Sequence, residues 1–167
     1  MNCSINNIAS RNKGFTLVEV LVATILVGMA IASLMAANAS LTRTNGAGID
    51  ISTAEFLLDQ IRELSYTLAV TDPETGTNVF GPEEGSLSDY DDIDDFDGKT
   101  FSPPIDADFQ QLDMFSSFSQ NITVSNVNSS NFNQVVSDHS SPFVKITVTI
   151  TQNGKQIVSQ SWIRAAE

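Results

Sequence analysis

The stretch FTLVEVLVATILVGMAIASLMAA, residues 15–37, decides how the rest of the chain is arranged. Its only charged residue is Glu19, and apolar side chains follow one another without a polar face. As an α-helix it is about 35 Å long, which suffices to cross the roughly 30 Å hydrocarbon core of a bilayer. A core helix of a small soluble domain would show a polar face. We therefore expect residues 15–44 to form a membrane-embedded helix.

The flanks of this helix predict its orientation. Arg11 and Lys13 precede the apolar stretch, whereas the first charged residue after it is Arg43. Basic residues next to a membrane span tend to stay in the cytoplasm. We expect the N-terminus to be cytoplasmic and the residues beyond about 40 to be extracytoplasmic.

Glu19 needs an explanation, because a carboxylate near the start of an apolar helix costs about 3 kcal/mol unless it is paired or neutralised. One interpretation is that its side chain reaches the nearby lipid headgroups. The other is that a cationic partner meets it inside an apolar assembly. The stretch 15–37 contains no basic residue, so such a partner comes from outside the helix.

Residues 11–20, RNKGFTLVEV, resemble the processing site of type IV prepilins, a class III signal. The shared features are a short basic leader ending in Gly14, then Phe15, then Thr-Leu-apolar-Glu and an unbroken apolar helix. The resemblance implies that a prepilin peptidase removes residues 1–14 and methylates the new amino group of Phe15. It also implies that Glu19 pairs with the Phe15 amino terminus of a neighbouring subunit. Such a pair would relieve the desolvation cost of both charges.

An ordinary secretory signal peptide is the alternative for the N-terminal region. Ala37-Asn38-Ala39 has the small-x-small form of a signal-peptidase site, which would place the mature N-terminus at Ser40. Against it, the apolar stretch exceeds the roughly 7 to 15 residues of a signal-peptide core. The stretch also contains Glu19.

A second helical pattern covers residues 45–71. Its apolar positions recur at spacings of three and four, which predicts one buried stripe: Ala54, Leu57, Leu58, Ile61, Leu64 and Leu68. The Asp72-Pro73 step is expected to end the helix. Gly46 and Gly48 leave two alternatives open, a bend within one long helix or a loop between two helices.

Residues 115–167 are predicted to form an antiparallel β-sheet. Apolar residues alternate with polar ones in 144–151, and Asn153-Gly154 is a strong hairpin signal. Regular pairing through that turn yields three expected pairs: Gln152 with Lys155, Ile150 with Ile157, and Lys145 with Trp162. Trp162 would then lie on the outer face, either as a partner contact or packed under a loop.

Further strands are expected at 118–127 and 132–136, with a turn at 128–131. The expected fold class is therefore α+β, with a long N-terminal helix packed on an antiparallel sheet of three or four strands. This layout also matches the pilin-like architecture that the resemblance implies.

The charge of the chain is concentrated in residues 72–114, a Pro-, Gly- and Asp-rich loop region. The chain has 20 acidic and 8 basic residues, and residues 72–113 hold 13 of the acids against one base, Lys99. Nucleic acid is therefore not an expected partner, since Lys and Arg supply affinity for phosphates. Because the chain has one cysteine and one histidine, it cannot form an internal disulfide. It also lacks the residues of the usual zinc sites and of cysteine- or histidine-based catalytic sites.

The acidic region contains a candidate calcium site, because Ca²⁺ prefers several carboxylate and carbonyl oxygens on a flexible loop. The candidate ligands are Asp91, Asp92, Asp94, Asp95 and Asp97. The spacing does not match an EF-hand, since Ile93 stands where an acid is required. The alternative is a solvated acidic loop whose Tyr90, Ile93 and Phe96 tuck onto the domain.

The expected function is that of a structural minor subunit of a bacterial type IV pilus-like filament. Its expected partners are a prepilin peptidase, the inner membrane, and other pilin or pseudopilin subunits bound through the N-terminal helix. The chain has no cysteine after Cys3, so it lacks the C-terminal disulfide loop typical of long pilins, which favours a minor role.

Two alternatives remain open: a pseudopilin of a type II secretion system, and a membrane-anchored extracytoplasmic protein that binds calcium. We do not expect an enzyme, since no nucleophile is accompanied by a base. The expected location is the inner membrane, with the head on the periplasmic side, and then the filament.

Overall fold

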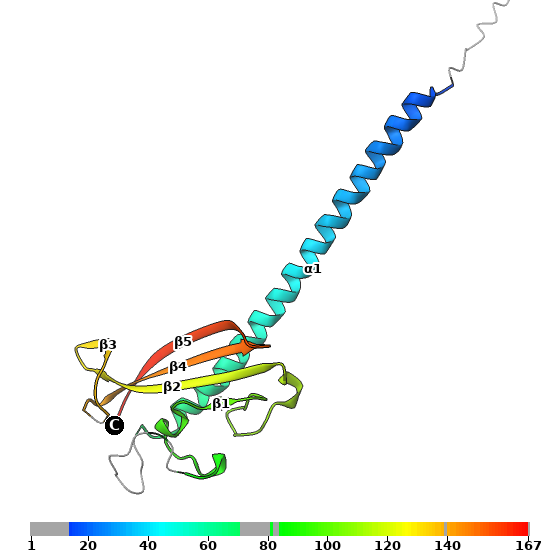
Figure 1. The fold of residues 1–167 in the computed structure, drawn as a ribbon. Helices are drawn as coiled ribbons and strands as arrows, with labels where there is room; N and C mark the ends of the chain where they lie inside the picture. The colour runs from blue at the N-terminus through cyan, green and yellow to red at the C-terminus, as the bar shows by residue number, and fades with distance from the viewer. Residues whose placement is uncertain (1–13, 71–80, 82–83, 139, 167) are drawn as a thin grey trace, which may run out of the picture. The chain divides into compact units, whose positions relative to one another are not determined.

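The computed structural model of the chain describes residues 14–70, 81, 84–138 and 140–166 (Figure 1). The leader residues 1–13, with Arg11 and Lys13, and the expected helix terminator Pro73 lie outside the described residues. The chain divides into two compact units, residues 1–46 and residues 47–167.

The helix α1 is assigned without interruption from Leu17 to Thr67. Gly46 and Gly48 lie within it, although each Gly costs about 1 kcal/mol relative to Ala in a helix. The alternative of two helices joined by a loop is therefore wrong, and one long helix is confirmed. A bend at this point stays a prediction.

Within the second unit, one stripe of α1 packs on the sheet. The stripe residues are almost completely inaccessible to solvent, and they are the ones that the spacing predicted: Ala54, Leu57, Leu58, Ile61 and Leu64. Leu68 is half-buried. Glu55, Asp59 and Glu63 between them stay exposed, so this half of the helix is amphipathic.

The helix ends at Thr67, before the Asp72-Pro73 step that the sequence analysis expected. Tertiary contacts explain the earlier end. The Arg164 guanidinium donates to the carbonyl oxygens of Ser65 and Leu68, which have no helical partner at a C-terminus. The next residue, Ala69, accepts a hydrogen bond of 3.0 Å from the Ile93 amide, which takes it out of helical geometry.

In the described part of the chain, the sheet has five antiparallel strands. They are β1 (Thr100–Phe101), β2 (Phe118–Asn128), β3 (Asn131–Val135), β4 (Phe143–Gln152) and β5 (Lys155–Ala165). Their order is β1-β2-β4-β5, with β3 pairing β2 (Figure 1). The α+β class and the antiparallel sheet are confirmed. The strand β1 was not predicted, because it lies within residues 72–114, which were expected to form a loop region.

The core lies between the helix stripe and the inner faces of β2 and β4. The fully or nearly fully buried strand residues alternate with more exposed ones: Ile122, Val124, Val144, Ile146, Val148 and Ile150. One polar residue, Gln120, is also fully buried there. Its side-chain amide donates to the carbonyl oxygens of Leu57 and Ile105 and accepts from the Ile105 amide, each at 2.8–2.9 Å. Gln120 therefore ties the helix, the sheet and the preceding loop together without an unsatisfied group.

The β4–β5 hairpin has the predicted turn but not the predicted register. Gln152 pairs with Lys155 as expected, but a bulge then leaves Ile157 unpaired, so Ile150 lies opposite Val158. One extra residue moves every later side chain of β5 to the other face. The predicted pairing of Lys145 with Trp162 is wrong, because Lys145 pairs with Ile163.

Trp162 consequently lies on the inner face of β5, opposite Ile146. Its indole nitrogen donates to the Ser65 hydroxyl at 3.1 Å, and the Arg62 guanidinium lies 5.2 Å from the centroid of its ring. Neither an outward partner contact nor a covering loop accounts for this residue. It anchors the end of α1 to the sheet.

Candidate functional site

The first candidate site is the start of α1. Thr16 precedes the first helical residue, and its hydroxyl accepts a 3.2 Å hydrogen bond from the backbone amide of Glu19. Thr-x-x-Glu before an apolar run is the sequence form of a capping box. Sequence reasoning missed Thr16 as a functional residue, although this pattern could have identified it. Since Thr16 follows the predicted cleavage point, the cap stays with the mature chain.

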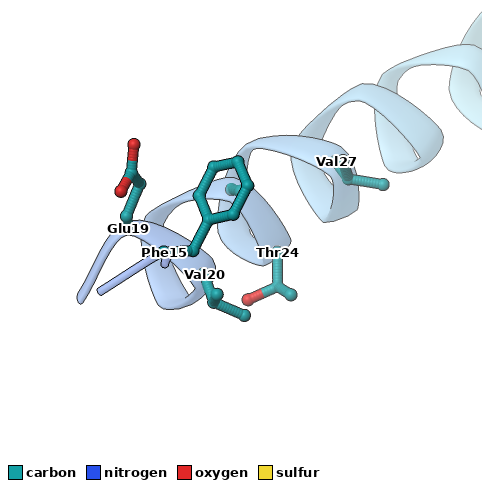
Figure 2. A pocket seen from close by; sticks show the side chains of 6 residues that line it. Phe15, Glu19, Val20, Thr24 and Val27 are labelled. Atoms are coloured by element: carbon teal, nitrogen blue, oxygen red, sulfur yellow. The ribbon is translucent and has the colours of Figure 1, made fainter. Parts of the chain in front are cut away.

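Phe15 and Glu19 lie at the edge of a shallow apolar groove on this end of the helix (Figure 2). The rest of it is lined by Val20, Ala23, Thr24 and Val27, and the Glu19 carboxylate points away from the helix. The Phe15 side chain is 82% exposed. Among the described residues, the Glu19 carboxylate has no hydrogen-bond or ion-pair partner.

The helix dipole alone does not account for Glu19. A carboxylate in the first turn gains about 0.3 to 1 kcal/mol from the partial positive charge of the helix N-terminus. A charged side chain within an apolar membrane segment costs about 3 kcal/mol. The dipole therefore leaves most of this cost uncompensated, and a positive partner from outside the chain would offset the rest.

The part of α1 from Leu17 to Ala37 carries apolar side chains around its whole circumference. Every described residue from Gly14 to Ile49 is exposed in the isolated chain. Large side chains that would normally be buried are among them: Leu17, Leu21, Ile25, Leu26, Met29, Ile31 and Leu34. Among the described residues, α1 is the one helix long and apolar enough to cross a membrane.

The second candidate site is the acidic segment, which is built into the head. Ile93 and Phe96 are fully buried, and the Phe96 ring contacts those of Tyr90 and Phe109 at centroid distances of 5.1 and 6.3 Å. The apolar residues thus tuck onto the domain as expected. The carboxylates do not stay solvated, because three neighbouring ones are at most 2% exposed: Asp92, Asp94 and Asp95.

Several of these carboxylates organise the backbone. Asp92 accepts hydrogen bonds from the amides of Asp94 and Asp95 at 3.0 and 3.2 Å, which starts the 3₁₀ turn η2 (Asp94–Phe96). Asp97 accepts from the Val124 amide at 2.8 Å and so joins this turn to β2. These hydrogen bonds give Asp92 and Asp97 a structural role, since buried backbone amides need acceptors.

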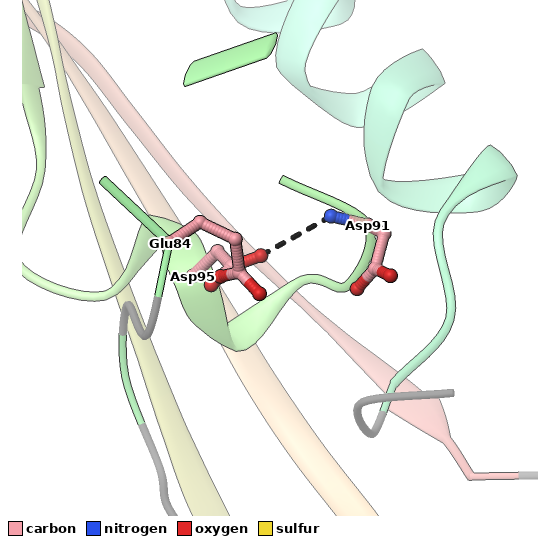
Figure 3. A group of neighbouring side chains, drawn as sticks. All are labelled: Glu84, Asp91 and Asp95. Carbon is pink, nitrogen blue, oxygen red and sulfur yellow. Dashed lines mark hydrogen bonds between the residues drawn. The ribbon is translucent and has the colours of Figure 1, made fainter. Parts of the chain in front are cut away.

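Asp91 and Asp95 come together with Glu84. One carboxylate oxygen from each of the three residues lies within 4.8 Å of the others (Figure 3). The Asp91 amide also donates to an Asp95 oxygen at 3.2 Å. Of the five predicted ligands, the structure therefore places two in this cluster, and Asp92, Asp94 and Asp97 lie outside it.

Glu84 was missed by sequence reasoning. It stands seven positions before Asp91, beyond Gly85 and the short 3₁₀ turn η1 (Leu87–Asp89). No periodic pattern connects it to the Asp-rich block. The one sequence feature that could have suggested Glu84 as a ligand is its position in the same acidic region.

Two buried carboxyl groups of this segment have raised pKa values. Burial raises the pKa of Asp95 from 3.8 to about 7, helped by a hydrogen bond with Glu84 and by the charges of Asp92 and Glu84. Burial likewise raises the pKa of Asp92 to about 7, together with the hydrogen bond and charge of Asp94. The amides that Asp92 accepts from act in the opposite direction. At neutral pH, the negative charge of these two buried carboxyl groups can therefore be neutralised by protons or by a cation.

Comparison with known proteins supports the first site. The family model of the prokaryotic N-terminal methylation motif matches residues 9–37, which include Gly14, Phe15 and Glu19. Neither curated proteins nor solved structures yielded a match. The prepilin-like resemblance is thus confirmed at the N-terminus, and the matched residues support a type IV pilin-like or pseudopilin protein in general terms. Such a motif implies processing by a prepilin peptidase and assembly with other pilins, and α1 is consistent with single-pass anchoring in the inner membrane.

Proposed function

We propose that the chain is a minor structural subunit of a type IV pilus-like filament and that it is not an enzyme. The observation that carries this proposal is the lone Glu19 carboxylate at the first turn of an apolar helix, next to Phe15. Cleavage after Gly14 would turn the backbone nitrogen of Phe15 into an amine, which is a cation at neutral pH. The same helix would then carry one positive and one negative group at its end.

Each chain would carry both groups at the same helical end, so a second copy packed alongside could supply the partner charge to each of them. The amino terminus of one subunit would pair with Glu19 of the next, and the exposed apolar side chains of both helices would be buried together. Each charge would otherwise stay desolvated and unpaired, which is the unfavourable case for buried ions. The pair would also determine the axial stagger between neighbouring subunits.

The proposed location before assembly is the inner membrane, with the head outside. The basic residues Arg11 and Lys13 before the apolar stretch support this orientation. The lack of a cysteine after Cys3 supports a minor rather than a major subunit. Neighbouring genes would distinguish the two filament systems. A secretion ATPase and a secretin without a retraction ATPase would favour a type II secretion pseudopilin.

The mature N-terminus tests the processing step. We expect mass spectrometry of the chain, purified from membranes that contain a prepilin peptidase, to identify a chain starting at methylated Phe15. A start at Ser40 would instead identify a signal peptide. An intact leader would support a membrane-anchored binding protein.

Charge substitutions at Glu19 test the assembly step. Glu19→Gln keeps the capping-box pattern and nearly the same side-chain volume but removes the charge. We expect its recovery in sheared filaments to fall about tenfold or more, because breaking a buried charge pair costs roughly 3 to 5 kcal/mol. Processing should continue.

Glu55→Gln is the matched control, since Glu55 is an exposed acid on the same helix within the head. We expect it to assemble like the wild type. Normal incorporation of Glu19→Gln would overturn the assigned role of the charge. Loss of incorporation in both variants would show that the effect is not specific to the helix N-terminus.

A further inference from the structure

We propose that Glu84, Asp91 and Asp95 bind a calcium ion inside the head domain. This role goes beyond the proposed filament function and does not depend on it, because Glu19 and Phe15 belong to the other compact unit. The site uses two of the acids that the Asp-rich block suggested and one acid from outside that block.

The spacing of the three carboxylates fits a common ion. Calcium–oxygen distances are about 2.3 to 2.6 Å, so two ligands of one ion lie at most about 5 Å apart. The three carboxylate oxygens lie within 4.8 Å of one another, which satisfies this limit for every pair (Figure 3). Glu84 lies in the segment before η1, Asp91 lies between η1 and η2, and Asp95 lies within η2.

The second observation is that two buried oxygens of the cluster lack a donor. Asp95 is 1% exposed, and neither its Oδ1 atom nor the buried Oε2 atom of Glu84 has a hydrogen-bond partner among the described residues. Leaving one oxygen of a buried, ionised carboxylate without a donor is unfavourable. A hydrogen bond between the carboxyl groups of Asp95 and Glu84 would need a proton on one of them, so it would not help when both are ionised.

No basic side chain within the described residues satisfies this need. Lys99, the one base among residues 72–113, has its ammonium 5.4 Å from the centroid of the Tyr90 ring. The ion pair found in the described part of the chain joins Arg62 to Asp59, on the helix. As far as the described residues show, a proton or a cation from solution is left as the neutralising species.

The donor set favours calcium over other metals. All three ligands are carboxylates, whereas zinc and copper sites normally include nitrogen or sulfur donors. Magnesium demands near-ideal octahedral geometry and keeps several waters. Calcium accepts six to eight oxygens in irregular arrangements, so backbone carbonyls and waters would complete its shell. Binding would hold Glu84 and the turn before η2 together.

The experiment uses the full-length chain in detergent, stripped of divalent ions with a chelator, at pH 8. Calcium chloride and magnesium chloride are titrated separately by calorimetry, and thermal unfolding is followed by the fluorescence of Trp162. We expect a dissociation constant of about 0.1 to 1 mM for calcium. A saturating concentration should raise the unfolding midpoint by about 5 °C. Magnesium should produce a much smaller shift.

Two variants remove ligands without adding bulk, Glu84→Gln and Asp95→Asn. Both should fold without calcium, because each relieves repulsion between carboxylates, and both should lose the calcium-dependent shift. Asp89→Asn is the matched control, since Asp89 is an exposed acid of the same segment. It should respond like the wild type. If Asp95→Asn fails to fold, Glu84→Gln still decides the test, because Glu84 is the less buried residue.

The proposal is overturned if the wild-type chain shows neither heat nor a midpoint shift at 10 times the expected dissociation constant, about 10 mM calcium. Protons would then be the neutralising species. A full calcium response in both ligand variants would also overturn it, as would an equal response to magnesium. None of these outcomes bears on filament assembly, which is measured through Glu19.

Discussion

The two halves of α1 are both rich in apolar side chains, but they use them differently. In residues 17–37, apolar residues occupy all sides of the helix, and Ile31 is 50% exposed in the isolated chain. In residues 47–67 they form a stripe, and Ile61 is completely buried against the chain's own sheet. A stripe is satisfied within one domain, whereas an all-round apolar surface needs apolar surroundings that the chain does not supply.

The same contrast holds for the carboxylates of the two units. Glu19 is exposed in the isolated chain, and its proposed partner is a positive charge on another subunit. Asp95 and the Oε2 atom of Glu84 are buried in the head, where protons and metal ions are small enough to bind. We therefore expect the first unit to respond to neighbouring molecules and the second to respond to the composition of the solution.

The largest expected effect separates the two halves of the helix. Ile61→Ala should lower the free energy of unfolding of the head by about 2 to 5 kcal/mol, because it opens a cavity in a packed core. Ile31→Ala should change the same quantity by less than about 0.5 kcal/mol. Urea unfolding in detergent, followed by Trp162 fluorescence, measures both. Equal effects would contradict the division between an exposed and a packed half.

A smaller effect concerns pH and the buried acids of calcium-free protein. The pKa values of Asp92 and Asp95 are about 7 in the folded chain, against ordinary values of 3.8. Between about pH 4 and 7 the folded state thus binds more protons than the unfolded state, so the free energy of unfolding should fall as pH rises. The carboxylates of Glu84 and Asp94 face these groups and act in the same direction as burial.

Asp95→Asn sharpens this prediction, because it removes one of the two titrating groups. The slope of unfolding free energy against pH should become shallower between about pH 4 and 7. The control variant Asp89→Asn should keep the wild-type slope. An unchanged slope in Asp95→Asn would show that this carboxyl group does not control the stability of the head.

The smallest expected effect is at the start of α1. Thr16→Val removes the hydroxyl that accepts from the Glu19 amide, which should cost about 1 kcal/mol of local helix stability. Hydrogen exchange at the Glu19 amide in detergent should become about fivefold faster, while Thr16→Ser should leave it nearly unchanged. The head should unfold as before in both variants. Equal exchange in the two variants would contradict the capping role.

Elements with a strong local pattern could be predicted from the sequence. The buried stripe of α1 was identified by its spacing, and β2, β3 and β4 followed from alternation and turn residues. The short strand β1 could not be found in this way, since Thr100 and Phe101 form a strand only because they pair with Gln120 and Asn121. Its existence depends on a tertiary contact.

The β5 register illustrates a second limit of sequence patterns. Asn153-Gly154 correctly predicted the turn, with positive φ angles of 50° and 78° at these two residues. Nothing local indicated that Ile157 would be bulged out. The position of the bulge depends on which face of the sheet directs Trp162 and Arg164 toward the end of α1. Their hydrogen bonds to Ser65 and Leu68 require both side chains to point inward.

The two candidate sites differ in the same way: the first has a local sequence pattern, and the second depends on tertiary contacts. Gly14, Phe15 and Glu19 lie close together in the sequence, so their association could be recognised as a motif. The acidic cluster combines Asp91 and Asp95 with Glu84, and the path of the intervening residues decides which carboxylates meet. Asp92 and Asp97 were equally attractive candidates by composition. The backbone amides that they accept from separate them from the cluster, and amides cannot be assigned from side-chain type.

The bulge at Ile157 has a consequence for solubility. In the described part of the sheet, β5 is an outermost strand, and one side of its backbone is open to a further strand. A long, flat edge of this kind is a template for uncontrolled aggregation, and natural sheets blunt it with bulges and charged residues. Ile157 interrupts the regular ladder near one end of β5, and Lys155 and Arg164 place positive charges near its two ends. A head that is concentrated along a filament would in this way avoid sheet-to-sheet association with its neighbours.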